Sequence, residues 1–208
     1  MKPTEPIKIF VEGVADLRFL QQFIEYHFNY SLDKDNHEVI IANGWEKIKT
    51  HSGAFLNEMR HNSDDGGNNL LIFDADSDYS SRFSDLEQWS NENHVQMDIF
   101  LFPNNHDRGD LESLLEHGIN PNNKPVFDCW NDYEESLKKI KIPGRNIPLT
   151  IPARKTKIYA YLEVLLGQSK KQKKLIKEMN RDYQNINHWD LNAPYLKDLK
   201  VFLAAYFS

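Results

Sequence analysis

The sequence predicts an α/β fold, built on a parallel four-stranded sheet that is flanked by helices and followed by a helical C-terminal extension. Three observations favour this class. Strand-like and helix-like segments alternate four times within about the first 100 residues. The third strand segment, residues 70–73, is wholly apolar, which is typical of a strand covered on both faces. After residue 103 only helical patterns follow.

The individual strands are predicted from short runs of β-forming residues bounded by turn signals, at 7–12, 38–42, 70–73 and 97–102. The helices between them are predicted from apolar residues spaced three and four positions apart, at 15–29, 45–59 and 82–93. A polar segment, residues 61–69, carries Asp-Asp-Gly-Gly at its centre and is expected to be a loop.

The remainder of the chain is predicted to be helical, at 110–116, 126–139, 155–166, 170–181 and 194–206. A link rich in proline and glycine, residues 142–152, interrupts this series. We therefore expect an α/β domain over residues 1–118 and a basic helical extension over 119–208 that packs on the same core.

The composition is that of a folded soluble protein, with 208 residues, 40% of them hydrophobic and 27% charged. The single cysteine, Cys129, excludes an internal disulfide framework and a multi-cysteine zinc site. No apolar run approaches the roughly 20 residues that span a bilayer, so no membrane association is expected. These features favour a cytoplasmic protein, and an oligomer is compatible with them.

Charge is distributed unevenly along the chain. Residues 1–137 have a net charge of −16, whereas residues 138–208 have a net charge of +10. Such asymmetry suggests an acidic half that holds cations and a basic half that holds an anionic polymer. Mutual attraction of the two halves on folding is an equally good interpretation of charge alone.

Three carboxylates stand at the ends of predicted strands. Glu12 ends the first strand, and Asp74 and Asp76 follow the third. Because ligands of an open parallel sheet bind beyond the carboxyl ends of its strands, we expect these side chains to converge, with no cation to neutralise them. Clustered carboxylate oxygens favour Mg²⁺ or Mn²⁺, which use one or two carboxylates and keep waters for a substrate phosphate.

A calcium-binding loop is the alternative interpretation of the acidic run that begins at Asp74. Its sixth position is Tyr79, where an EF-hand loop needs glycine, and its twelfth is Asp85, where glutamate is usual. A strand also precedes the run instead of a helix. These departures disfavour the calcium loop.

The segment 11–20, Val-Glu-Gly-Val-Ala-Asp-Leu-Arg-Phe-Leu, resembles the first motif of the Toprim domain of topoisomerases, primases and OLD-type nucleases. The segment 73–76, Phe-Asp-Ala-Asp, resembles the Asp-x-Asp motif of that domain, in the right order and at the right distance. The resemblance covers roughly residues 7–116. The chain most resembles the small stand-alone bacterial Toprim proteins that are related to the OLD-type branch.

The resemblance implies roles for particular residues. Glu12 would act as general acid or base or join the metal shell, and Asp74 and Asp76 would hold Mg²⁺. OLD-type members add a further acid, which Glu112 matches best and Asp110 second best. A late lysine that faces the phosphate is matched by Lys155 or Lys157.

Together these features predict a metal-dependent nuclease acting on DNA or RNA. Its polyanion contacts are expected from the basic stretch, at Arg154, Lys157, Lys170 and Lys171. Strand passage and primer synthesis would need more chain than is present. Two other functions stay open: a Toprim-fold module that binds a nucleotide or nucleic acid without cutting it, and a subunit that docks a basic partner. The resemblance also suggests a defence or repair complex with a separate ATPase.

Overall fold

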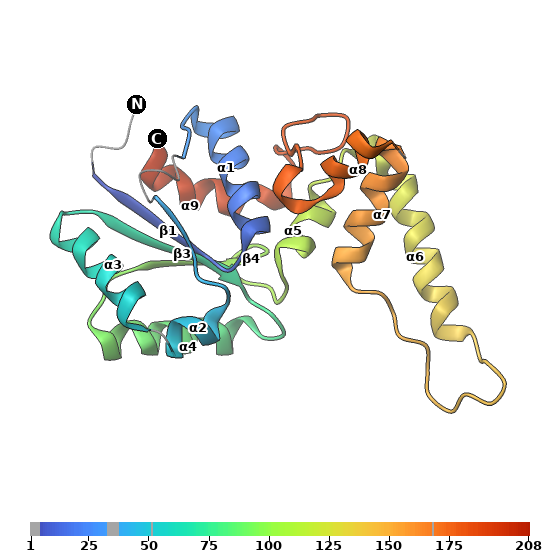
Figure 1. Cartoon of the computed structure of the whole chain (residues 1–208), viewed down its shortest axis with the longest axis horizontal. Helices are drawn as coiled ribbons and strands as arrows, with labels where there is room; N and C mark the ends of the chain where they lie inside the picture. The colour runs from blue at the N-terminus through green and yellow to red at the C-terminus, as the bar shows by residue number, and fades with distance from the viewer. Residues whose placement is uncertain (1–4, 33–37, 51, 168) are drawn as a thin grey trace.

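The computed structural model describes residues 5–32, 38–50, 52–167 and 169–208. Its centre is a four-stranded sheet in the order β2-β1-β3-β4, in which all neighbours are parallel (Figure 1). The strands are β1 (Ile7–Val11), β2 (Val39–Ile41), β3 (Asn68–Asp74) and β4 (Asp98–Phe102). The predicted α/β class with a parallel four-stranded sheet is confirmed.

Helices cover both faces of the sheet (Figure 1). One face carries α1 (Val14–Phe28) and α9 (Lys197–Phe207), and the other carries α2 (Trp45–Thr50), α3 (Ser52–Asp64) and α4 (Tyr79–Asn93). Side chains of each strand alternate between the two cores, so that Ile9 packs with the α1 side and Phe10 with the α2 side. Both cores exclude water, which explains the continuous apolar run in β3.

The element boundaries between residues 45 and 70 differ from those predicted. The expected helix 45–59 is described as α2 and α3, and α3 continues to Asp64, into residues expected to form a loop. β3 starts at Asn68, before its apolar run. The reason is a pair of buried amides: Asn62 Nδ2 donates to the Asn68 carbonyl oxygen at 2.9 Å and to Asn69 Oδ1 at 3.0 Å. Satisfied in this way, polar residues fit inside regular elements.

Beyond β4 the chain is helical, as expected. The elements are α5 (Leu111–His117), α6 (Lys124–Lys139), α7 (Arg154–Leu166) and α8 (Lys170–Ile176), with 3-10 turns at Pro121–Asn123, Glu178–Asn180 and Pro194–Leu196. The predicted helix 170–181 is therefore shorter than expected. Helices α6 and α7 and the exposed segment 140–153 between them project from the body of the molecule as an arm (Figure 1).

The C-terminal extension shares its core with the sheet. Tyr183 lies edge-on to Phe19 of α1, with ring centroids 5.3 Å apart, and Phe202 of α9 lies 5.3 Å from Phe100 of β4. One buried cluster runs from the sheet through α1 and α9 to Tyr161 of α7. Within the described residues, no helix combines the length and apolar character that crossing a bilayer requires.

Candidate carboxylate site at the sheet edge

Glu12 and Asp74 meet at the carboxyl edge of the sheet. Glu12 directly follows β1, and Asp74 is the last residue of β3. These two strands are parallel neighbours, and Val11 of β1 is paired with Ile72 of β3. The backbone N–H of Asp74 donates to Glu12 Oε1 at 3.3 Å. The predicted convergence of these two acids, 62 positions apart in the chain, is confirmed.

Two further elements bring acids to the same edge. Asp16, on the first turn of α1, is 7% exposed, and its Oδ2 accepts the backbone N–H of Gly13 at 2.7 Å. Asp74 Oδ1 accepts the backbone N–H of Leu111 at 3.0 Å, which fixes the start of α5 against β3. Asp110, which precedes Leu111, is close enough for its charge to act on Asp74, and the charge of Glu112, which follows Leu111, acts on Asp16.

The pKa values of these acids are raised because burial penalises their charged forms and because they repel one another. The pKa of Asp74 is raised to about 9, first by burial and then by the charges of Asp16, Glu12 and Asp110. The pKa of Asp16 is raised to about 7, by burial and by Glu12 and Glu112. Burial also raises the pKa values of Glu12 and Glu112. The site therefore has a strong electrostatic preference for protons or another cation.

Asp76 stands apart from this group. Its backbone has a φ of +54°, and its N–H donates to the Gly109 carbonyl oxygen at 2.8 Å. Its carboxylate is 58% exposed and forms an ion pair with Arg82 of α4. The expectation that no cation neutralises the three strand-end acids is therefore wrong for Asp76. Arg82 also opposes the rise in the pKa of Glu12, but in the described residues no ion pair joins a cation to Glu12 or Asp74.

Two glycine turns bound the site. Gly44, after β2, has a φ of +96°, and a Cβ atom there would lie 3.9 Å from Glu12 Oε2. Gly109, before α5, has a φ of +145°, and a Cβ atom there would lie only 2.6 Å from Ser113 Oγ. Both positions require left-handed backbone, which glycine adopts without strain. The turns therefore keep backbone close to Glu12 and to the start of α5.

The start of α7 supplies basic groups at the rim. Arg154 Nη1 lies 3.6 Å from Asp110 Oδ1 and also donates to Ser113 Oγ. Lys155 forms an ion pair with Glu178. Its charge also lowers the pKa of Glu112, but burial, the larger effect, raises that pKa. Both basic side chains are more than half exposed, so they are accessible to a ligand that approaches the carboxylates.

The other predicted basic contacts lie elsewhere. Lys157 is buried: its Nζ donates to Glu116 at 3.0 Å and to Asn131 at 2.9 Å, and it lies 4.8 Å from the centre of the Phe127 ring. It therefore fastens α6 to α7, and its assignment to nucleic-acid binding is wrong. Lys170 and Lys171 are exposed but belong to the start of α8, beyond the opposite end of α7 from Arg154. A 13-residue helix separates them from the site by about 20 Å.

Asp16 is the member of the group that sequence reasoning missed. It follows Glu12 by four positions, one helical turn, inside a segment that reads as an ordinary amphipathic helix start. An acid three residues after the helix-capping position is usually explained by capping alone, and the Gly13 contact shows that Asp16 has that role too. The spacing of four residues between Glu12 and Asp16 was the signal in the sequence that could have identified Asp16 as a member of the group.

The carboxylates at this edge suit a hard divalent cation that needs only one or two ligands from the protein. The ligand atoms are carboxylate oxygens, the side chains are largely buried, and their raised pKa values show that positive charge is lacking. Among the described residues, however, no three histidine, cysteine, aspartate or glutamate side chains converge into a ready metal cage. Mg²⁺ and Mn²⁺ fit the Glu12 and Asp74 pair, because such ions take one or two carboxylates and complete their shells with water. Metals that need a full protein cage do not fit.

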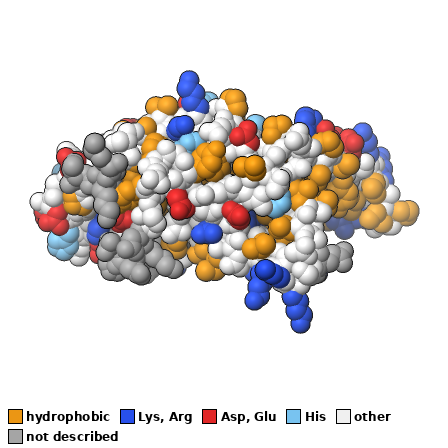
Figure 2. All heavy atoms as spheres, turned by 90° about the horizontal axis from the view of Figure 1, so that it is seen from above, with side chains coloured by type: hydrophobic (Ala, Val, Ile, Leu, Met, Phe, Trp, Pro, Cys, Tyr) orange, Lys and Arg blue, Asp and Glu red, His pale blue; other side chains and the backbone are white. Residues whose placement is uncertain are grey.

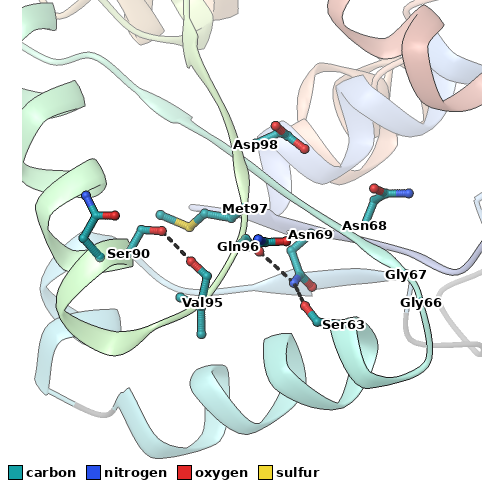
Figure 3. Close-up of a pocket in the computed structure, with 11 residues that line it drawn as sticks. Ser63, Gly66, Gly67, Asn68, Asn69, Ser90, Val95, Gln96, Met97 and Asp98 are labelled. Carbon is teal, nitrogen blue, oxygen red and sulfur yellow. Dashed lines mark hydrogen bonds between the residues drawn. The ribbon is translucent and has the colours of Figure 1, made fainter.

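A hollow lies at the opposite, amino edge of the sheet. It measures about 560 Å³ and is lined by α3, α4 and the starts of β3 and β4 (Figure 3). Its buried centre is Asn69, whose Nδ2 lies 3.0 Å from Ser63 Oγ and 3.0 Å from the Gln96 carbonyl oxygen. Because these polar groups already hydrogen-bond to one another, the buried centre of the hollow lacks the charge repulsion found at the carboxylate edge.

The arrangement defines an α/β protein with a buried acidic group at the carboxyl edge of a parallel sheet. Residues 6–208 match the family described as "Protein of unknown function (DUF3226)", and the chain belongs to this family. Comparison with curated proteins yields no match. Comparison with solved structures yields none either.

Proposed function

We propose that this protein is a metal-dependent phosphoryl-transfer enzyme, a nuclease that hydrolyses phosphodiester bonds in DNA or RNA. The observation that carries the proposal is the meeting of Glu12, Asp16 and Asp74 with the acids of the α5 start at one edge, beside exposed basic groups on α7. Buried acids with raised pKa values are typical of functional sites. The resemblance of segments 11–20 and 73–76 to Toprim motifs agrees with this chemistry.

Each group has a part in such a reaction. Glu12 and Asp74 would hold Mg²⁺ or Mn²⁺, with Asp16 and Asp110 next to them. A bound ion of this kind supplies positive charge for the phosphate and lowers the pKa of its water. Glu112, whose pKa burial raises above the ordinary glutamate value, is suited to exchange a proton with a water or a leaving oxygen.

The basic residues at the start of α7 would receive the substrate. Arg154 and Lys155 are exposed and stand beside Asp110 and Glu112, where they can neutralise charge on a phosphate. Lys170 and Lys171 on α8 would extend the contact along a polyanion. Binding through such contacts weakens steeply with salt. We place the reaction in the cytoplasm, in keeping with the single cysteine.

The test is cleavage of plasmid DNA, linear duplex, single-stranded DNA and RNA by the purified full chain with Mg²⁺, Mn²⁺ or a chelator. Cleavage is expected only with a metal, and Glu12→Gln and Asp74→Asn are expected to abolish it. Glu163→Gln, an exposed change on α7, is the matched control. Equal cleavage by the wild type and Asp74→Asn would count against the proposal.

A non-catalytic binding module is the second candidate. Two observations favour it: the described acids form no ready three-ligand cage, and Asp76 is already paired with Arg82. Under this function a nucleotide or nucleic acid binds at the Arg154 rim but is not cut at any metal concentration. A separate ATPase partner, suggested by the OLD-type resemblance, would be recovered by pull-down from the source cells in either case.

A further inference from the structure

His117 and Tyr195 form a stacked ring pair beside the carboxylate site. The imidazole of His117, at the end of α5, lies almost parallel to the Tyr195 ring, with ring centroids 3.8 Å apart and an interplanar angle of 14°. Among the described residues this is the closest and most nearly parallel pair of rings. His117 is exposed and Tyr195 is half-buried. Since one face of the imidazole lies on Tyr195, the rest of that ring stays open to a ligand.

The two rings are held in place before any ligand arrives. His117 Nδ1 donates to the Ser113 carbonyl oxygen at 2.9 Å, which fixes the imidazole on the surface of α5. Tyr195 belongs to the 3-10 turn Pro194–Leu196 and packs against the main hydrophobic core. A ligand that stacks on this pair therefore orders few side chains when it binds.

Arg154 connects the ring pair to the acids of the sheet edge. Its guanidinium lies 3.6 Å from Asp110, at the start of α5, and 4.0 Å from Glu116, the residue before His117. Asp110 and His117 are seven positions apart, which corresponds to about 10 Å along a helix. A nucleic-acid strand whose phosphate lies at the carboxylates and at Arg154 therefore also reaches the two rings.

Charge indicates which part of a nucleotide the rings receive. Burial raises the pKa of Tyr195, and the charge of Asp107 raises it further, so an acid lies close to the ring pair. This acid repels a phosphate but accepts a neutral base. Phosphates are attracted instead to Arg154 and Lys155, which are both more than half exposed. Figure 2 shows Lys and Arg side chains gathered toward the end of the molecule that carries α6, α7 and α8.

Stacking on a side-chain ring requires a base with a free face. In a duplex the neighbouring base pairs cover both faces, whereas unpaired bases are readily stacked on aromatic side chains. Proteins that bind single strands combine such rings with basic groups that follow the phosphates. The ring pair and the neighbouring Arg154 and Lys155 have this composition.

We propose that His117 and Tyr195 stack an unpaired nucleobase of the substrate while Arg154 holds a phosphate of the same strand, so that single-stranded nucleic acid is the preferred substrate. This inference rests on the proposed function, because it names the form of nucleic acid that the carboxylate site receives. The ring pair would hold the strand, and the acids would act on it.

The first test is binding of the purified full chain to a fluorescein-labelled single-stranded DNA and to its duplex, with a chelator present so that no cleavage occurs. The single strand is expected to bind about tenfold more tightly, the effect of one stacked base. His117→Ala is expected to remove this difference and to keep the wild-type dependence on salt, because no phosphate contact is lost. His61→Ala, at an exposed position on α3, is the matched control. Equal binding of the two DNA forms by the wild type, or wild-type binding by His117→Ala, overturns the proposal.

The second test separates stacking from other roles of the histidine. His117→Phe keeps a ring and is expected to restore single-strand binding, whereas His117→Gln keeps only hydrogen-bonding capacity and is expected to bind as weakly as His117→Ala. A 2-aminopurine base in the single strand should lose fluorescence on binding to the wild type and to His117→Phe, but much less with His117→Ala. Full binding by His117→Gln contradicts a stacking role.

The same variants distinguish this inference from the nuclease function. Preference for single strands that depends on His117, without cleavage in Mg²⁺ or Mn²⁺, would leave the stacking site standing and count against the nuclease. Metal-dependent cleavage of duplex alone, at the wild-type rate in His117→Ala, would support the nuclease and overturn the stacking site.

Discussion

The two edges of the sheet bury polar groups in opposite ways. At the amino edge, Asn62 and Asn69 are almost wholly buried, and Asn69 Nδ2 lies within 3.0 Å of three acceptors. At the carboxyl edge, Asp16 and Asp74 are buried against other acids, and their pKa values rise to about 7 and about 9. Satisfied amides hold the fold together, whereas mutually repelling acids store electrostatic energy that a bound cation would release.

The largest expected effect is on catalysis at the carboxyl edge. Asp74→Asn is expected to abolish metal-dependent cleavage, since it removes a charge that holds the ion. Asp76→Asn is expected to lower it much less, because Asp76 is exposed and paired with Arg82. The measurement is initial cleavage rate at saturating metal. Equal losses in the two variants would show that Asp76 turns toward the metal in the working enzyme.

A substitution at the amino edge is expected to lower the stability of the fold and not the rate of cleavage. Asn69→Ala removes one of the two acceptors of Asn62 Nδ2 and the amide group shared by three acceptors, and it should lower the free energy of unfolding by about 1–3 kcal/mol. Urea unfolding followed by circular dichroism measures this change. Cleavage per folded molecule should stay at the wild-type rate. A loss of rate without loss of stability would place the amino-edge hollow in the function after all.

The pH dependence of stability should also distinguish the two edges of the sheet, because the buried aspartates lie at the carboxyl edge. Because the folded-state pKa values of Asp16 and Asp74 lie above the ordinary aspartate value, the folded state binds more protons, and its stability falls as pH rises from about 4 to about 9. Asp74→Asn removes part of this loss and should raise the melting temperature at pH 8. Each kcal/mol gained corresponds to roughly 2–4 °C in a chain of this size.

Added Mn²⁺ supplies the companion experiment. It should raise the wild-type melting temperature at pH 8 and leave that of Asp74→Asn nearly unchanged. A matched series with Asn69→Ala, which keeps all the acids, should show the full metal response. A wild-type melting temperature that is flat with pH and indifferent to metal contradicts the electrostatic account of the carboxyl edge.

The smallest expected effect is at the rim. Arg154→Gln should weaken nucleic-acid binding several-fold and reduce the salt slope by about one unit, because one phosphate contact is lost. Lys171→Gln, on α8, should have a smaller effect. Fluorescence anisotropy at several salt concentrations measures both. A larger effect at Lys171 would move the main polyanion contact to α8.

Sequence reasoning placed the sheet, its four strands and the approach of Glu12 to Asp74. It succeeded because apolar runs and turn residues are local signals, and because parallel strands necessarily bring their carboxyl ends to one edge. It failed where a neighbour from a distant element decides the outcome. Lys157 reads as a surface cation in its own segment, yet Glu116 and Asn131 enclose it.

The sequence by itself determined the alternation of strands and helices, and with it which chain ends meet, since these follow from residue periodicity and chain connectivity. Only the tertiary structure decided which side chains meet: that Asp16 turns into the acidic group, that Arg82 takes Asp76 away from it, and that Tyr195 stacks on His117. The physical reason is that burial and charge pairing act through space between elements. Their partners are fixed only when the helices pack.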